Sequence, residues 1–88
     1  MTKKAKWLLN EAIRLVGREF RLSQAHLREL KSGKENMARH MAFSLAGEVL
    51  GLPPSDVFKK YLKHIPGLKK VHWRLRRELQ KKLVDFDV

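Results

Sequence analysis

The stretch ENMARHMAFSLAGEVL, residues 35–50, has the most regular helical period in this sequence. Its apolar residues recur at intervals of three and four, and they are Ala38, Met41, Ala42, Leu45, Ala46 and Val49. This spacing places them on one face of an α-helix, where several small side chains allow a neighbouring helix to approach closely. The stretch therefore predicts a helix packed against other helices, and Gly51 is expected to end it.

The sequence before this stretch predicts two further helices. Residues 3–20 carry a wide apolar stripe, with most of their basic residues outside it; the stripe consists of Leu8, Leu9, Ala12, Ile13, Val16 and Phe20. A short helix over residues 24–30 is expected after Ser23, a suitable N-cap, with Leu27 and Leu30 facing inward. This helix is expected to end near Gly33, since glycine readily adopts the left-handed conformation that stops a helix.

The sequence after residue 51 predicts a fourth and a fifth helix. The fourth covers residues 55–62, starts at Ser55 or a proline before it, and has its inward side at Val57, Phe58, Tyr61 and Leu62. The fifth starts near Pro66, which suits a first helical turn, and its inward stripe is Leu68, Val71, Leu75 and Leu79. Since no strand signal is present, we expect an all-α fold of about five helices.

Length and composition limit the class of protein further. A chain of 88 residues is expected to form one domain over residues 1–88, because two separate cores would be too small. With 43% apolar and 33% charged residues, a soluble protein without a membrane span is expected. The absence of cysteine excludes disulfides and thiolate metal sites and fits a reducing cytosol. The net charge of +11 indicates a polyanionic partner.

The charge is concentrated in PGLKKVHWRLRRELQKKL, residues 66–83, which has seven Lys or Arg and one acid, Glu78. Its outward side is predicted to consist of Lys69, Lys70, Trp73, Arg74, Arg77 and Lys81. A charge run is often only a solvated face, but such a face would usually mix both signs. With the preceding helix, the segment has the form of a helix-turn-helix over about residues 55–83, whose second helix enters the major groove of DNA.

The spacing also resembles domain IV of the bacterial replication initiator DnaA, a helix-turn-helix module of the Trp-repressor-like fold. The resemblance is carried by FRLSQAHL at residues 20–27, RHMAFSLAGEVLGLPPSDV at residues 39–57, Tyr61 and Val71. It implies that the helix from Leu68 reads the major groove, that Lys31 and Lys34 form a basic loop at the minor groove or backbone, and that Arg39 lies near DNA. HIPGLKK replaces the base-reading motif of that family, so another target sequence is expected. The chain has no G-x-x-x-x-G-K-[ST] motif and is too short for the ATPase domain.

The sequence gives little indication of metal binding or catalysis. The four histidines, His26, His40, His64 and His72, have no ligand-like spacing and are expected at surface or boundary positions, so no metal site is predicted. No serine stands in a pattern of nucleophile and base, and neither catalysis nor a cofactor is expected. Trp73 either stacks on a sugar or base, or packs against a helix or a second subunit.

The sequence thus predicts a small non-enzymatic protein that binds double-stranded DNA and regulates transcription or replication, in the cytoplasm and associated with the nucleoid. RNA binding and sequence-neutral DNA binding stay open, as does pairing of two copies over two half-sites. The alternative is a protein-interaction module, in which the first helix and the DFDV tail dock on a partner and the positive charge steers it.

Overall fold

The computed structural model describes residues 2–29 and 33–87, and side chains over residues 2–29 and 36–86. The regular structure of this part of the chain is entirely helical, without a strand, which confirms the predicted all-α class. Its five helices are α1 (Lys3–Phe20), α2 (Gln24–Arg28), α3 (Gly33–Glu48), α4 (Asp56–His64) and α5 (Leu68–Asp87). Among these helices, none combines the length and the apolar character needed to cross a membrane.

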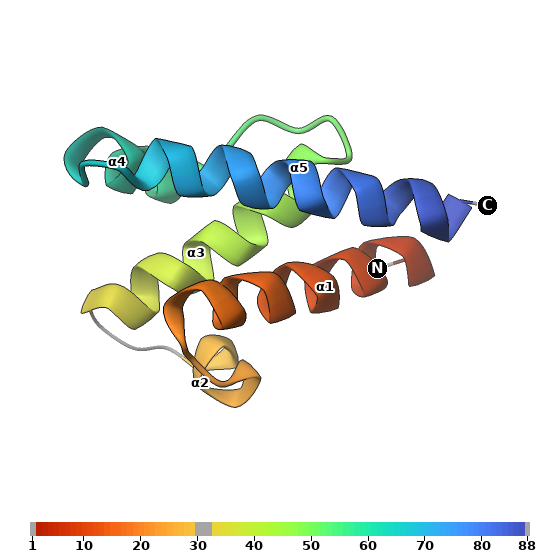
Figure 1. Ribbon diagram of the computed structural model, residues 1–88, viewed down its shortest axis with the longest axis horizontal. Helices are drawn as coiled ribbons and strands as arrows, with labels where there is room; N and C mark the ends of the chain where they lie inside the picture. The colour runs from red at the N-terminus through yellow and green to blue at the C-terminus, as the bar shows by residue number, and fades with distance from the viewer. Residues whose placement is uncertain (1, 30–32, 88) are drawn as a thin grey trace.

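The central element is α3, which packs against each of the other four helices. α1 and α5 lie side by side and run in opposite directions, while α3 crosses them at an angle (Figure 1). The start of α1 therefore lies beside the end of α5, where the rings of Trp7 and Phe86 stack with centroids 4.7 Å apart. α4 lies at the opposite end of the molecule, next to the first turn of α5 (Figure 1).

Three helices begin at a side chain that accepts a hydrogen bond from the first helical turn. Thr2, Ser23 and Ser55 each accept from the backbone N–H three residues later, at 3.0, 3.2 and 3.1 Å. Such N-caps satisfy a donor that the helix itself leaves unpaired. The predicted caps Ser23 and Ser55 are therefore confirmed.

The turn after α1 depends on Gly17. Arg21 adopts the left-handed conformation with a φ of 56°, and the N–H of Leu22 donates to the carbonyl of Gly17 at 2.9 Å. A Cβ on residue 17 would lie 2.7 Å from the carbonyl oxygen of Leu22. A side chain at this position would push the turn away from α1, so glycine is required by close approach.

The structure corrects two predicted helix boundaries. Gly33 opens α3 instead of ending α2, which stops earlier because Glu29 is extended with φ −96° and ψ 150°. Pro66 precedes α5 and is not part of its first turn, since the chain turns at Gly67 with a φ of 81° before the helix begins. Gly51 follows α3 with a φ of 98°, as expected of a residue that ends a helix.

The core joins the inward sides of all five helices. Its largest fully buried apolar side chains are Leu8, Ile13, Leu15, Val16, Leu27, Met41, Leu45, Phe58, Leu75 and Leu79. The predicted inward position of Val57 is wrong, because its side chain is 44% exposed and the inward side of α4 is centred on Phe58. Val71 is only half-buried, and Leu30 lies outside the described residues.

Candidate nucleic-acid interface

α5 has an inward side fixed in the core and an outward side formed by cations. Leu75 and Leu79 are fully buried. Lys69, Lys70, Arg77 and Lys81 are exposed on the outward side, and none of these four forms an ion pair with another described residue. Together with Trp73 we call them the cationic face of α5. Their charges are free to meet an anionic partner.

Trp73 lies within the cationic face. Its side chain is 57% exposed, although tryptophan is a large apolar residue. The guanidinium carbon of Arg76 lies 5.4 Å from the centre of the Trp73 ring, and the edge of His72 approaches it with centroids 6.4 Å apart. Trp73 thus takes no part in the core and presents its ring at the surface.

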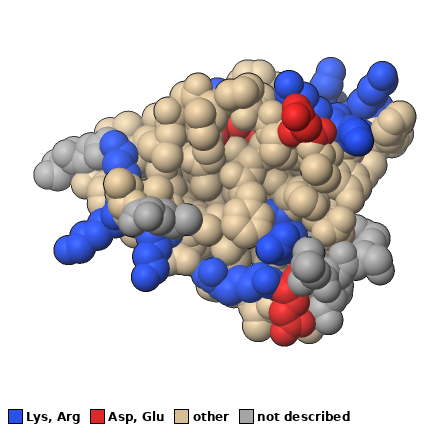
Figure 2. All heavy atoms as spheres, turned by 180° about the vertical axis from the view of Figure 1, so that it is seen from behind, with Lys and Arg blue, Asp and Glu red and all other residues tan. Residues whose placement is uncertain are grey.

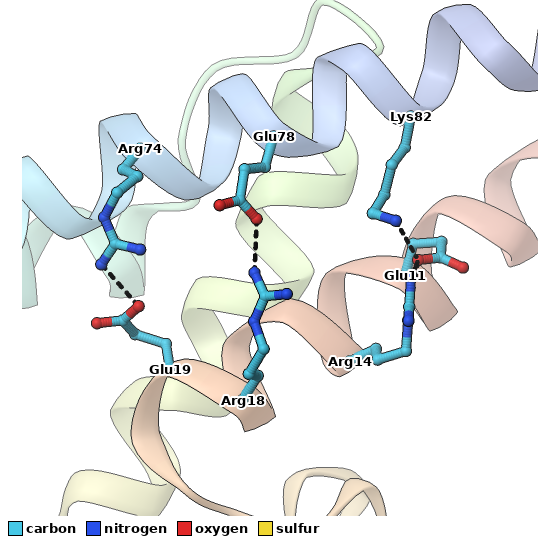
Figure 3. A network of polar contacts seen from close by, with 7 residues as sticks. All are labelled: Glu11, Arg14, Arg18, Glu19, Arg74, Glu78 and Lys82. Atoms are coloured by element: carbon cyan, nitrogen blue, oxygen red, sulfur yellow. Dashed lines mark hydrogen bonds and ion pairs between the residues drawn. The ribbon is translucent and has the colours of Figure 1, made fainter.

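Arg74 is directed away from this face and toward α1. Its Nη2 donates to Oε1 of Glu19 at 2.6 Å, while the side chain stays 52% exposed. Two further ion pairs join α1 and α5 in the same seam: Arg18 to Glu78 at 2.7 Å, and Lys82 to Glu11 at 3.7 Å (Figure 3). Exposed pairs of this kind contribute about 0 to 1 kcal/mol each. The predicted exposure of Arg74 is confirmed, but a DNA phosphate would compete with Glu19 for its guanidinium.

α4 adds a second cationic surface that the sequence interpretation missed. Lys59, Lys60 and Lys63 are exposed on its outer side, with Asp56 4.0 Å from Lys59. Figure 2 shows Lys and Arg atoms gathered at the α4 end of the molecule, beside a small acidic area. Since only residues 65–67 connect α4 to α5, these lysines lie near the start of α5. Their recurrence at three- and four-residue intervals was the signal that could have identified them.

Arg39 is not brought next to the cationic face of α5. It stands nine positions before Glu48, which faces α5, and nine positions are about two and a half helical turns, so the two residues lie on opposite sides of α3. The guanidinium of Arg39 lies 4.8 Å from the ring centre of Phe43, and its Nε is buried without a hydrogen-bond partner among the described residues. A contact of Arg39 with DNA stays a prediction.

The predicted basic loop falls largely outside the structure. Lys31 lies outside the described residues, and so does the side chain of Lys34. The backbone of Lys34 belongs to the first turn of α3.

A buried polar cluster holds α5 against α3. The carboxylate of Glu48 accepts hydrogen bonds from Ser44 Oγ at 2.6 Å and His72 Nε2 at 2.8 Å. Ser44 in turn accepts from the backbone N–H of Ser55 at 3.1 Å, which ties in the start of α4. The expectation that His72 occupies a surface or boundary position is therefore wrong. Its place four residues after Leu68 and three before Leu75, on the inward stripe, was the available signal.

The electrostatics of this cluster favour an ionised Glu48. Burial by itself raises the pKa of Glu48, because it disfavours a charged carboxylate. The hydrogen bonds from His72 and Ser44, with the electrostatic attraction of His72 and Arg76, outweigh burial and hold this pKa below its ordinary value of 4.5. Nη1 of Arg76 lies 3.8 Å from the carboxylate. α3 and α5 are thus joined through one buried anion, and Ser44 links the start of α4 to the same cluster.

The other side of α3 carries an apolar depression of about 170 Å³ next to α1. Its lining residues are Ala5, Leu9, Phe43, Ala46, Gly47 and Leu50. Phe43 and Leu50 are 39% and 46% exposed, and nearby Leu52 is 62% exposed. This surface is separate from the cationic face of α5.

A comparison with known proteins finds no matching family model, no matching curated protein and no matching solved structure. The resemblance to DnaA domain IV therefore stays a prediction from the residues that carry it. Over the described residues, no group of three or more His, Cys, Asp or Glu side chains is placed to hold a metal ion.

Proposed function

We propose that this protein is a non-enzymatic double-stranded DNA-binding protein that presents the cationic face of α5 to the major groove. One observation carries the proposal. Of the seven Lys and Arg residues of α5, three have an acidic partner, namely Arg74, Arg76 and Lys82. The other four have none among the described residues, and all four lie on the outward side.

The paired and the unpaired cations of α5 have different roles in the proposed DNA binding. The paired cations attach α5 to α1 and α3, so the helix is held in place before any partner arrives. The unpaired cations can neutralise phosphates and release condensed counterions, which supplies a large share of the affinity of such proteins. Arg77 can also grip the O6 and N7 atoms of a guanine in the major groove.

The helix-turn-helix of residues 55–83 gives α4 a supporting role in this proposal. The lysines on the outer side of α4 would contact the phosphate backbone beside the groove that α5 enters, and such contacts fix orientation without reading sequence. The resemblance to DnaA domain IV supports a role in regulating transcription or replication.

Selection from a random pool of duplex DNA tests the proposal. An enriched motif is expected if α5 reads bases, and a titration with competing RNA then ranks the two nucleic acids. Binding without a motif would point to sequence-neutral DNA packaging. If the protein leaves duplex DNA unbound even at low salt, the proposal is wrong.

In that case a protein-interaction module becomes the better candidate, and the apolar depression between α1 and α3 favours it. Exposed apolar patches on small proteins often mark sites of association. The first helix itself offers little apolar surface for a partner, because Leu8, Ala12, Ile13 and Val16 are buried in the core. The exposed side chains of Phe43, Leu50 and Leu52 would form the contact instead.

A further inference from the structure

Trp73 has basic residues at the neighbouring positions on the surface of α5. Residues three and four positions away are its neighbours on a helix surface. For Trp73 these four neighbours are Lys69, Lys70, Arg76 and Arg77. A basic residue thus occupies each of the four neighbouring helix positions of this exposed indole ring, and of these four only Arg76 has an acidic partner among the described residues.

Intact duplex DNA offers no free base face on which Trp73 could stack. In a B-form helix the bases are stacked on each other, so a protein in the major groove meets their edges and not their faces. An unpaired base exposes its flat face, and stacking on an aromatic side chain is the usual way in which proteins hold it. The phosphates on both sides of such a base need cations close to the aromatic ring.

Trp73 is suited to serve as that aromatic ring. Its indole lies 5.4 Å from the guanidinium carbon of Arg76, an arrangement in which the cation and the ring attract each other. Lys69 and Lys70 precede the ring by one helical turn and Arg77 follows it by one turn, so cations are available in both directions along the helix axis.

We propose that Trp73 is a stacking platform for an unpaired base, and that the cationic face of α5 therefore binds nucleic acid with unpaired bases. The ligand is a nucleotide with a free base face and flanking phosphates, in single-stranded DNA, in RNA or at an interruption of a duplex. This inference rests on the proposed function, because it assumes that the cationic face of α5 is where nucleic acid binds.

Trp73 fluorescence gives a direct test. The change Trp7→Phe removes the second tryptophan and keeps an aromatic ring against Phe86. In that background, oligothymidylate and oligouridylate should quench the emission of Trp73 on binding, since a stacked base quenches indole. A perfectly paired duplex of the same length should quench it much less. Comparison of the two single strands shows whether the 2′-hydroxyl matters.

Affinities of Trp73 variants complete the test. Trp73→Ala should weaken binding of the single strand by roughly 5- to 150-fold, the range measured for one stacked base, and should weaken duplex binding far less. Trp73→Phe keeps a smaller ring and should fall between the parent and Trp73→Ala. Because Trp73 lies outside the core, all variants should keep the helical circular dichroism of the parent.

The failures of the two proposals can be told apart. If duplex DNA binds but single strands neither bind nor quench Trp73, the stacking inference is overturned and the proposed function stands. Equal losses for duplex and single strand in Trp73→Ala would also overturn the inference. If the parent binds neither form, the proposed function is wrong and the inference with it.

Discussion

Glu48 is a carboxylate with no exposed side-chain surface, and it stays in the interior because donors surround it. A buried charge without partners would cost several kcal/mol, whereas a paired and hydrogen-bonded one is tolerated. Ser44 and His72 supply the hydrogen bonds, and Arg76 adds a more distant positive charge. The cluster therefore sets where α5 lies on α3 and makes this position sensitive to single substitutions.

Replacing Glu48 by Ala should strongly destabilise the protein. It leaves the imidazole of His72 buried without its acceptor, and removing one member of a buried pair costs about 3–5 kcal/mol. Urea unfolding followed by circular dichroism measures this free energy. Glu11→Ala is the matched control, because it removes a carboxylate from partly exposed ion pairs and should cost about 1 kcal/mol or less. Equal losses for both variants would contradict the assigned role of Glu48.

The lowered pKa of Glu48 predicts how stability depends on pH. The folded state holds Glu48 ionised at a lower pH than the unfolded chain does, so its stabilising contribution is complete above the ordinary value of 4.5 and is lost as pH falls through the lowered value. Glu48→Gln cannot titrate at this position. The difference in unfolding free energy between the parent and Glu48→Gln should therefore shrink as the pH falls below the ordinary value of 4.5. A difference that stays constant or grows toward acid pH would refute this.

Arg77 and Arg14 offer a comparison between two exposed arginines of equal charge. Arg77 has no acidic partner among the described residues and lies on the cationic face of α5, while Arg14 binds Glu11 on α1 at 2.7 Å. Arg77→Ala should weaken duplex DNA binding by roughly 1–3 kcal/mol if the side chain reads a base, with little change in melting temperature. Arg14→Ala should leave binding close to that of the parent. A fluorescence anisotropy titration separates the two, and equal affinities would remove α5 as the reading element.

At the scale of the helices, the inward stripe of α5 packs in the core. Leu75 is fully buried, so Leu75→Ala should cost about 2–5 kcal/mol through lost contacts and the cavity left behind. Val71 was expected to be equally buried but is half-buried, and Val71→Ala should cost clearly less. Urea unfolding of both variants ranks the two positions. The reverse order would show that α5 is rotated about its axis relative to this structure.

The helices also show what sequence alone can predict. The bounds of α1 and the buried positions of Leu75 and Leu79 were predicted well, because each needs information from one segment only. The partners of Glu48 and Arg74 were not predictable in this way. His72 is 24 residues from Glu48 and Glu19 is 55 residues from Arg74, so these contacts depend on how separate helices pack.

The glycines also show that residue type alone does not determine the local structure. Gly51 stops a helix as its residue type suggests, but Gly33 begins one. Glycine permits a left-handed turn without enforcing it, and the outcome is decided by the backbone around it. The candidate site was predicted only in part: the exposed cations of α5 were identified, whereas the lysines of α4, near the start of α5, were missed.

At the scale of the whole molecule, size limits how many phosphates can be contacted. The described chain measures 37 by 25 by 21 Å, and one turn of duplex DNA is about 34–36 Å long. A single copy therefore covers about one turn. The unpaired cations of α5 and the lysines of α4 are the groups available for phosphates within that length.

The number of cations that contact phosphates determines how strongly binding depends on salt. If roughly four to seven of these cations contact phosphates, the logarithm of the binding constant should fall against the logarithm of salt concentration with a slope between roughly −4 and −6. Changing both Lys70 and Lys81 to Gln should make the slope shallower by about 2, since each lost contact removes about 0.9. Changing both Lys3 and Lys6 to Gln removes the same charge from α1 and should leave the slope nearly unchanged. If both double variants flatten the slope equally, the net charge of +11 attracts DNA without a defined binding surface.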